Sequence, residues 1–306
     1  MKRILITGAN SYIGTSVENH IKQWPEKYSI DTIDMIDSSW REVDFSCYDT
    51  IFHVAGIAHS DNGKITKEKE KLYYEVNTDL TRETAKKAKA EGVKQFVFMS
   101  SVIVYGESAP IGKKKNITKD TPVCPANCYG DSKVQAENGI VPLQDVCFNV
   151  VVLRPPMIYG KGSKGNFPML EKFAGKAPIF PKVKNERSML YIDNLAEFVR
   201  LIIENNEKGV FWPQNSEYSN TTEMVKLIAA CKGKRVFTTR LFNPLLKLLS
   251  FKMNVINKAF GSLTYDMNIS KYHMEYCLYD NVQSIAATEG LADTEHIRRK
   301  DFDGKR

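Results

Sequence analysis

Residues 3–14, RILITGANSYIG, join a short apolar run to a turn that contains two glycines. The run predicts a buried strand, and the pattern from Tyr12 to about Lys22 predicts a helix. Gly8 allows a tight turn, and Gly14 lets the helix pack closely on the strand. The N–H groups at the start of such a helix favour a pyrophosphate. The turn is therefore a candidate dinucleotide site, with Gly8, Asn10, Ser11, Tyr12, Ile13 and Gly14 as its residues.

The same alternation of short apolar runs and helical patterns continues to about residue 155. We expect further strands at 29–35, 50–55, 96–100 and 146–153, and helices at 67–91 and 129–139. This order predicts an α/β fold in which helices cover both faces of a doubly wound parallel sheet. We expect residues 1–155 to form the dinucleotide-binding domain and 156–293 a smaller C-terminal substrate-binding lobe, interleaved with the last sheet elements. Residues 294–306 are charged and predict a flexible tail.

The cofactor preference is predicted from the end of the second strand. An acidic residue about 20 positions after the turn binds the ribose hydroxyls of a dinucleotide. Asp34 stands there, with Asp37 as the alternative. No Arg or Lys between Asp31 and Ser39 would neutralise a 2′-phosphate. The sequence therefore favours NAD over NADP.

A candidate catalytic group follows in the chain. Tyr129 and Lys133 stand four positions apart in an expected helix, so they share one face. A phenol titrates near about pH 10 and carries protons poorly at neutral pH. An ammonium one turn away favours the phenolate, so we expect Lys133 to lower the pKa of Tyr129. Ser101, at the end of the fourth expected strand, is suited to hydrogen-bond the same substrate oxygen.

Other motifs carry a resemblance to a known family. They are Asp44-Phe45, His53-Val54-Ala55-Gly56, Asn77, Met99-Ser100-Ser101, Val104-Tyr105-Gly106, Leu153–Gly160, Gly165-Asn166-Phe167 and Arg187–Asp193. With the turn, Tyr129 and Lys133, they make nearly the whole chain similar to the extended short-chain dehydrogenase/reductases of the NAD-dependent epimerase/dehydratase family. The chain most resembles UDP-sugar 4-epimerases and bacterial UDP-4-ketosugar reductases. The resemblance implies a Rossmann-type sheet, a UDP-sugar substrate and a homodimer paired through helices at 78–91 and 129–139.

The resemblance also implies residue roles. Asp44 and Phe45 are expected against the adenine. Ala55, Gly56, Asn77 and Lys133 are expected to line the nicotinamide ribose. Asn166 and Phe167 are expected near the uridine diphosphate, and Arg187 near its phosphates. A forked Arg contact with a diphosphate is physically favourable.

The chain departs from the family pattern at three places. The middle glycine of the turn is Ser11, which is small enough for close approach of a cofactor. Related dehydratases carry an Asp-Glu pair just after the catalytic hydroxyl residue, whereas Val102 and Ile103 stand here, so the chain is expected not to be a 4,6-dehydratase. Cys277 aligns with the position that gates the sugar pocket of 4-epimerases, with a buried core cysteine as the alternative.

The motifs leave several functions open. A UDP-sugar 4-epimerase with NAD, for surface polysaccharide synthesis, is the first prediction, with a UDP-hexose or UDP-N-acetylhexosamine as substrate. An NAD(P)H-dependent reductase of a UDP-4-keto-6-deoxy-N-acetylhexosamine is the alternative, because the same three residues serve both reactions. A non-catalytic dinucleotide sensor or scaffold is a third, disfavoured because Tyr129 and Lys133 are both present.

Composition excludes other classes of protein. The net charge of +7 comes from scattered Lys and Arg residues with no nucleic-acid-reading motif. The six cysteines form no C-x-x-C pair, which predicts reduced thiols in the cytoplasm and no metal site. No signal peptide is expected ahead of the first strand. Residues 241–260 are too polar to span a bilayer, and we expect a core-packed amphipathic helix there, with a membrane-surface or partner-binding helix as the alternative.

Overall fold

A computed structural model describes residues 1–58 and 65–291 of the chain. Its centre is a six-stranded parallel sheet in the order β10-β6-β4-β3-β1-β2. The strands are β1 (Lys2–Thr7), β2 (Tyr28–Ile33), β3 (Thr50–His53), β4 (Gln95–Met99), β6 (Asn149–Leu153) and β10 (Gly209–Phe211). The first strand lies between β2 and β3, so the chain winds in both directions away from it. The predicted doubly wound Rossmann-type sheet is confirmed.

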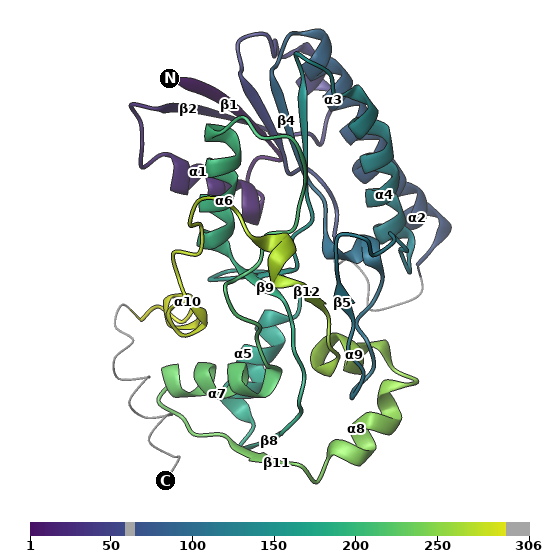
Figure 1. The fold of residues 1–306 in the computed structure, drawn as a ribbon, viewed down its shortest axis with the longest axis vertical. Helices are drawn as coiled ribbons and strands as arrows, with labels where there is room; N and C mark the ends of the chain where they lie inside the picture. The colour runs from purple at the N-terminus through teal and green to yellow at the C-terminus, as the bar shows by residue number, and fades with distance from the viewer. Residues whose placement is uncertain (59–64, 292–306) are drawn as a thin grey trace.

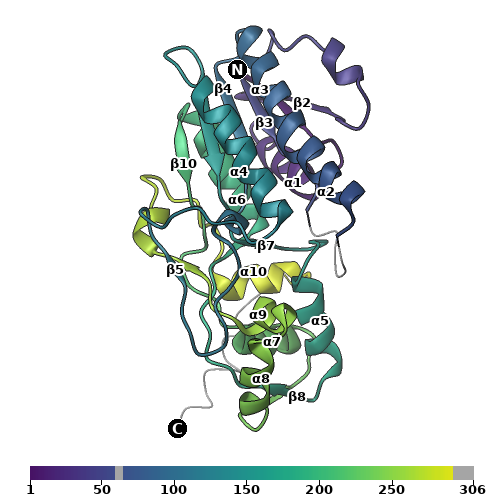
Figure 2. The same ribbon diagram turned by 90° about the vertical axis from the view of Figure 1, so that its right-hand side faces the viewer.

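Helices cover both faces of this sheet (Figures 1 and 2). One face carries α1 (Tyr12–Ile21) and α6 (Ile192–Glu204), which pack on each other. The other carries α2 (Lys67–Tyr74), α3 (Leu80–Ala90) and α4 (Cys128–Ile140). Successive side chains of β1 point to opposite faces of the sheet, and each face has its own hydrophobic cluster. Ile4 and Ile6 join the cluster under α1 and α6, whereas Leu5 joins the cluster under α3 and α4.

The expected helix at 67–91 is interrupted by a π-helical turn, Glu75–Asp79, between α2 and α3. Such turns bulge one residue out of the regular ladder and occur often at functional sites. Here the turn carries Asn77, whose side chain is fully buried. The sequence pattern predicted the helix but not the bulge.

A second group of elements lies beyond the carboxyl edge of the sheet (Figure 1). It contains α5 (Phe167–Lys176), α7 (Thr221–Cys231), α8 (Asn243–Ser250), α9 (Asn254–Phe260) and α10 (Asn281–Thr288). Three parallel strand pairs accompany them: β7 (Met157–Tyr159) with β9 (Met189–Tyr191), β8 (Ile179–Pro181) with β11 (Phe237–Thr239), and β5 (Asn116–Ile117) with β12 (Thr264–Tyr265). Short 3₁₀ turns occupy Ser39–Glu42, Val102–Tyr105, Val141–Leu143 and Met267–Ser270.

The two groups exchange segments along the chain. β10 and α6 come late in the sequence but belong to the main sheet, whereas β5 comes early and pairs with β12. We therefore retain the division near residue 155 as a proposal about roles, with the sheet holding the cofactor and the lobe the substrate. The expected tail at 294–306 lies outside the described residues.

The core-packed helix expected at 241–260 is a wrong prediction. The segment forms α8 and α9, separated by residues 251–253. Leu241, Leu245 and Leu248 are 85%, 57% and 64% exposed, so they do not enter the core. The apolar residues lie on more than one side of α8, and the lobe covers only one of them. No described helix is long and apolar enough to cross a bilayer.

Candidate active site

The turn after β1 has the backbone that its glycine predicts. Gly8 adopts a φ of +89°, and a Cβ at this position would lie 2.9 Å from the Ala55 Cα. Any side chain here would therefore collide with the loop after β3. The N–H groups of Gly8 and Ala9 donate to the Ile33 carbonyl at 2.9 and 3.0 Å. This ties the turn to the end of β2, where the ribose-binding acid is expected.

Ser11 has a structural role of its own. Its hydroxyl accepts from the Gly14 N–H at 3.1 Å and so caps the first turn of α1. A Cβ on Gly14 would lie 2.6 Å from that hydroxyl, so the two residues depend on each other. Tyr12 follows, and its buried hydroxyl has no hydrogen-bond partner among the described residues. A free phenol donor beside a helix N-terminus suits a dinucleotide phosphate. Ile13 packs half-buried against the core under α1 and α6.

A second edge of the site is made by the loop after β3. The Asn77 amide accepts from the Ile57 N–H at 2.9 Å and donates to the Ile57 carbonyl at 3.1 Å. It also donates to the Ser132 hydroxyl on α4 at 3.1 Å. A Cβ on Gly56 would lie 3.0 Å from the Asn77 Oδ1 and 3.3 Å from the Lys133 Nζ. Gly56 is exposed, so the loop presents bare backbone beside an amide and an ammonium, which fits a ribose.

Lys133 is held beneath this loop. Its ammonium donates to the Met99 carbonyl at 2.9 Å and lies 4.7 Å from the centre of the Phe98 ring. The side chain is 5% exposed, and burial lowers its pKa to about 8. Removing an ammonium from water is costly, and the nearby Glu137 carboxylate only partly offsets this cost.

Tyr129 and Ser101 are brought together by α4 and the end of β4. A hydrogen bond from the Ser101 hydroxyl lowers the pKa of Tyr129, but burial raises it more, to about 12. The Tyr73 ring of α2 packs 5.8 Å from the Tyr129 ring. The expected lowering of the Tyr129 pKa by Lys133 is therefore not found. The spacing of the two residues could not reveal how strongly α2 and α4 would exclude water from the phenol.

A buried ion pair fixes this end of α4. Glu137 lies one turn after Lys133 and pairs with the Arg154 guanidinium, with its Nε at 3.2 Å. The Ser100 hydroxyl donates to the same carboxylate. Arg154 also donates to the Tyr105 hydroxyl at 2.6 Å. The network joins the ends of β4 and β6 to α4, so it positions the residues that precede and follow Ser101.

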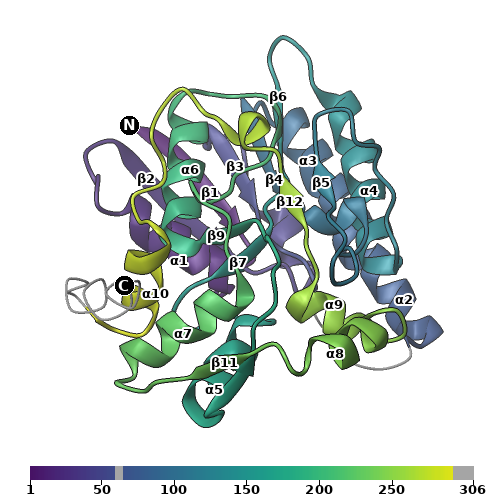
Figure 3. The ribbon, with the colours of Figure 1, turned by 60° about the horizontal axis from the view of Figure 1, so that its bottom comes forward.

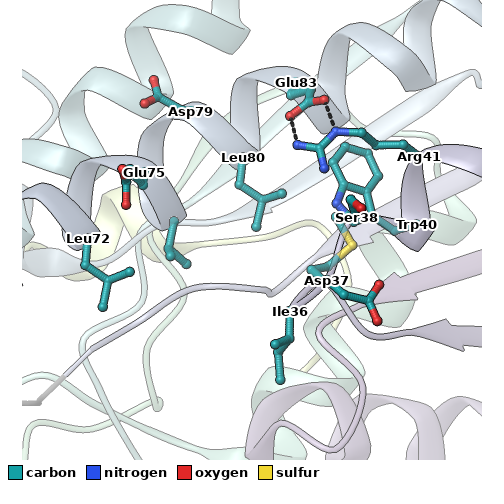
Figure 4. A pocket seen from close by; sticks show the side chains of 12 residues that line it. Ile36, Asp37, Ser38, Trp40, Arg41, Leu72, Glu75, Asp79, Leu80 and Glu83 are labelled. Carbon is teal, nitrogen blue, oxygen red and sulfur yellow. Dashed lines mark hydrogen bonds and ion pairs between the residues drawn. The ribbon is translucent and has the colours of Figure 1, made fainter.

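A cavity of about 390 Å³ lies between the loop after β2 and the α2–α3 helix (Figure 4). Asp37 lines it, whereas Asp34 is exposed just before it and accepts from the Ile36 N–H at 3.0 Å. Arg41 also lines the cavity, where its guanidinium pairs with the Glu83 carboxylate at 2.5 and 2.6 Å. The sequence did not point to Arg41, which lies two positions beyond the cation-free stretch between Asp31 and Ser39. The partner, Glu83, is 42 residues away in the sequence.

Asp44 and Phe45 do not line this cavity. Phe45 is fully buried, with the Lys87 ammonium 4.9 Å from its ring. Its N–H donates to Glu91, at the end of α3. Asp44 is exposed and accepts from the Ser46 N–H at 2.8 Å. The structure thus places this pair beside the last turn of α3, away from the cavity that Asp37 and Arg41 share.

Asn166 and Arg187 meet in a narrow pocket of the lobe. Its walls are Met157, Asn166, Met169, Leu170, Arg187, Met189, Thr221, Met224, Lys258 and Ala259. The Arg187 guanidinium is buried and donates to the Gly261 carbonyl at 3.2 Å. Among the described residues no carboxylate pairs with it, and burial lowers its pKa to about 10. A buried cation that faces only carbonyl oxygens is suited to an anionic group.

Phe167 and Cys277 lie elsewhere. Phe167 is 1% exposed and stacks on Tyr159 at 5.2 Å, so its side chain belongs to the core. The Cys277 thiol lies 3.5 Å from the Gln214 carbonyl, and burial raises its pKa to about 11. Neither side chain lines the pocket of Asn166 and Arg187.

Comparisons with known proteins agree with this geometry. The model of the "NAD dependent epimerase/dehydratase family" matches residues 4–212. The chain is 29% identical to a UDP-glucose 4-epimerase of Vibrio cholerae, over 88% of this chain and 89% of the relative. It is 28% identical to an N-acetyl-alpha-D-glucosaminyl-diphospho-ditrans,octacis-undecaprenol 4-epimerase of Escherichia coli O157:H7, over 84% and 81% of the two chains.

Solved structures share the fold. A UDP-glucuronic acid 4-epimerase from Bacillus cereus in complex with NAD superposes with a TM-score of 0.70 at 17% identity, over 97% of this chain and 99% of that chain. A dTDP-4-dehydrorhamnose reductase from Bacillus anthracis with NADP gives a TM-score of 0.62 at 20% identity, over 78% and 84%. With the turn after β1, the Asn77 loop and the Ser101, Tyr129 and Lys133 group on one scaffold, the chain belongs to the NAD-dependent epimerase/dehydratase family of nicotinamide-dependent enzymes.

Proposed function

We propose that the protein is a cytoplasmic UDP-sugar 4-epimerase that retains NAD. The observation that carries this proposal is the pairing of two sites on one scaffold. The Tyr129 and Ser101 hydroxyls meet beside the Asn77 loop, and Arg187 offers a buried, unneutralised guanidinium to a diphosphate. A sugar joined to a diphosphate has one group for each site.

The residues divide the chemistry as follows. A bound NAD supplies a reversible hydride store at C4 of the sugar. Tyr129 would take the proton of the C4 hydroxyl in its ionised, phenolate form, and the Ser101 hydroxyl would donate to the same C4 oxygen. Tyr129 would return the proton to the C4 oxygen once the sugar has turned its other face toward the site. Asn166 and Arg187 hold the diphosphate while the sugar turns.

The absence of an acid–base pair supports epimerisation over dehydration. Val102 and Ile103 form the first residues of the 3₁₀ turn that Ser101 caps. Neither side chain can move a proton at C5 or C6 of a sugar. We therefore propose that the enzyme does not eliminate water.

The names of the relatives support a sugar diphosphate substrate, and we propose that its product serves surface polysaccharide synthesis. Both matched epimerases are named for a sugar joined to a diphosphate, one as a UDP-sugar and one as a diphospho-undecaprenol. The alternative reductase of a 4-ketosugar would use Tyr129 as the proton donor with NADH or NADPH as co-substrate. Its fold is represented among the solved neighbours.

Cofactor retention separates the two reactions. We expect heat-denatured protein to release about one NAD per chain, because an epimerase regenerates its cofactor within each turnover. We also expect interconversion of UDP-glucose with UDP-galactose, or of their N-acetyl forms, without added dinucleotide. Protein that releases no dinucleotide and oxidises added NADPH only with a 4-ketosugar would instead establish the reductase.

Tyr129→Phe tests the catalytic group. Removing the phenol oxygen takes away the proton carrier, so we expect turnover to fall by at least about 100-fold with NAD content unchanged. Tyr74→Phe is the matched control. It removes an α2 hydroxyl that donates at 2.8 Å to Asp131, a residue of the helix that carries Tyr129. Equal turnover of Tyr129→Phe and Tyr74→Phe would refute the assignment.

Arg187→Gln tests the diphosphate pocket. We expect the KM for a UDP-sugar to rise by at least about tenfold, because a charge-assisted contact is lost. The NAD content of the purified protein should not change, since the cofactor lies on the sheet. A variant with an unchanged KM would show that the diphosphate binds elsewhere.

A further inference from the structure

Helix α8 lies at the far end of the lobe (Figures 1 and 3). Its segment exposes apolar side chains to solvent. Leu245 and Leu248 stand three positions apart in α8, so they share one side of the helix, and Leu241 is exposed just before it. Phe242 and the residues after the helix extend the surface. We call it the α8 face, and its members are Leu241, Phe242, Leu245, Leu248, Phe251 and Met253, each at least 45% exposed.

The opposite side of α8 is anchored to the protein. Leu246 and Leu249 are half-buried, and Ser250 is 1% exposed. The Asn243 amide donates to the Lys182 carbonyl at 2.9 Å, and the Asn257 amide of α9 donates to the Ser250 carbonyl at 2.7 Å. The exposed leucines are therefore the outer side of a fixed element. A contiguous apolar surface of this kind marks a site of association.

The chain around the face is rich in basic residues, and residues 224–265 contain no Asp or Glu. Lys226 and Lys232 pair with Glu223 and Glu289. No ion pair among the described residues involves the cations nearest the face in the sequence, which are Arg240, Lys247 and Lys252. Lys247 and Lys252 lie between the exposed apolar residues and are themselves exposed. Apolar side chains interleaved with Lys and Arg are typical of segments that lie in the interface of an anionic bilayer.

We propose that the α8 face docks the enzyme on the surface of an anionic lipid bilayer. The apolar side chains enter the headgroup boundary, and Arg240, Lys247 and Lys252 meet the lipid phosphates. A second copy of the chain fits the face less well. A two-fold interface would pair the face with itself and so bring two positively charged surfaces together, and like charges repel.

The docking is independent of the reaction proposed above, but it has a geometric consequence for it. α9 packs on α8 and contributes Lys258 and Ala259 to the pocket of Asn166 and Arg187. The Asn257 and Gly261 carbonyls that face the Arg187 guanidinium belong to the same segment. Docking therefore places the proposed diphosphate pocket one helix away from the lipid surface.

Vesicle flotation of the purified full-length protein tests the proposal. We expect binding to phosphatidylglycerol vesicles that weakens with salt, and much weaker binding to vesicles of phosphatidylcholine alone. Leu245→Glu/Leu248→Glu should lose at least about tenfold in affinity for the phosphatidylglycerol vesicles, because two charges replace apolar groups that would enter the bilayer. Lys247→Gln/Lys252→Gln should lose about 25-fold in affinity, at roughly fivefold for each lysine.

The control is Val146→Glu, which replaces a fully exposed apolar residue next to β6 at the amino edge of the sheet. It should bind vesicles like the wild type, and all variants should melt at the wild-type temperature. Absence of wild-type binding to phosphatidylglycerol, or equal loss in the Val146 variant, would overturn the proposal. Light scattering in which Leu245→Glu/Leu248→Glu turns a dimer into a monomer would overturn it too, by assigning the face to a second copy.

Discussion

Arg41 lines the cavity after β2, and we propose that it influences the choice between NAD and NADP. The guanidinium is the one group of this loop that suits a 2′-phosphate, but the Glu83 carboxylate occupies both arms of its fork (Figure 4). A phosphate would have to displace that carboxylate and would meet its negative charge. The Arg41–Glu83 pair is therefore a second argument for NAD. The first was that no Arg or Lys lies between Asp31 and Ser39.

Glu83→Gln should shift this preference. With the carboxylate gone, Arg41 is free to bind a 2′-phosphate, and we expect the Kd for NADP to fall by about tenfold. The Kd for NAD should change little. Both constants are measured by titration of the dinucleotide-free protein. Adding Arg41→Ala to Glu83→Gln should remove the gain, and a gain that persists would show that another residue binds the phosphate.

Lys133 imposes a cost in stability. Its pKa of about 8 in the folded protein lies below its ordinary value of 10.5, so the unfolded chain binds the proton more tightly. Between these two values the unfolded state carries more protons, and wild-type stability rises with pH. The cost is fully present below about pH 8 and is lost toward about pH 10.5.

Lys133→Met should therefore raise the free energy of unfolding at pH 7 by about 1–3 kcal/mol while it abolishes turnover. The gain in unfolding free energy should vanish as the pH approaches 10.5, the pKa of an ordinary lysine. Urea unfolding of the dinucleotide-free protein at several pH values measures it. A variant that is destabilised equally at every pH would show that Lys133 stabilises the fold.

At the scale of elements, α4 is fixed to the sheet by the Glu137–Arg154 pair. The two side chains are 5% and 12% exposed, so breaking the pair leaves a buried, uncompensated charge. We expect Glu137→Gln to lower the free energy of unfolding by about 3–5 kcal/mol. Glu137→Gln/Arg154→Met, which removes both charges, should recover part of this loss. Urea melts give both values, and a loss below about 1 kcal/mol would contradict the role of the pair.

Secondary structure was predictable wherever local pattern and tertiary packing agree. β1, α1, β4 and α4 begin and end within two residues of the expected ranges, because each carries a regular apolar period and a clear boundary. The π-turn at 75–79 was not predictable. It is stabilised by Asn77 contacts to residues 20 and 55 positions away, which no local period contains.

Some residues of the candidate site were likewise predictable from the sequence, and others were not. The proximity of Ser101 and Tyr129 was predictable because the end of β4 and the start of α4 meet at the carboxyl edge of the sheet, and Lys133 follows one turn later on α4. The expected contact of Asp44 and Phe45 with the adenine stays a prediction, and the chain between β2 and β3 turns Phe45 toward α3. Cys277 and Phe167 were expected near the substrate from alignment alone, and their burial depends on the late helices.

At the scale of the whole molecule, the expected homodimer stays a prediction. The outward sides of α3 and α4 carry exposed polar residues, among them Arg82, Lys86, Gln135 and Asn138. Such a surface pairs through hydrogen bonds and charges, so we expect a dimer that weakens with salt. Light scattering should give twice the chain mass of 34.8 kDa at low ionic strength. A mass of one chain at every concentration and salt would refute it.

The contacts of Arg187 also have a consequence for biosynthesis. Its two carbonyl partners are 70 and 74 residues further along the chain. On the ribosome, β1, β2, β3, β4 and β6 are complete before Arg187 is made, but the guanidinium keeps its water until Gly261 has emerged. Five strands of the main sheet are therefore made before Arg187, whereas α6, β10 and the segment that surrounds the guanidinium follow it. We expect a chain released before Gly261 to lack the pocket of Asn166 and Arg187.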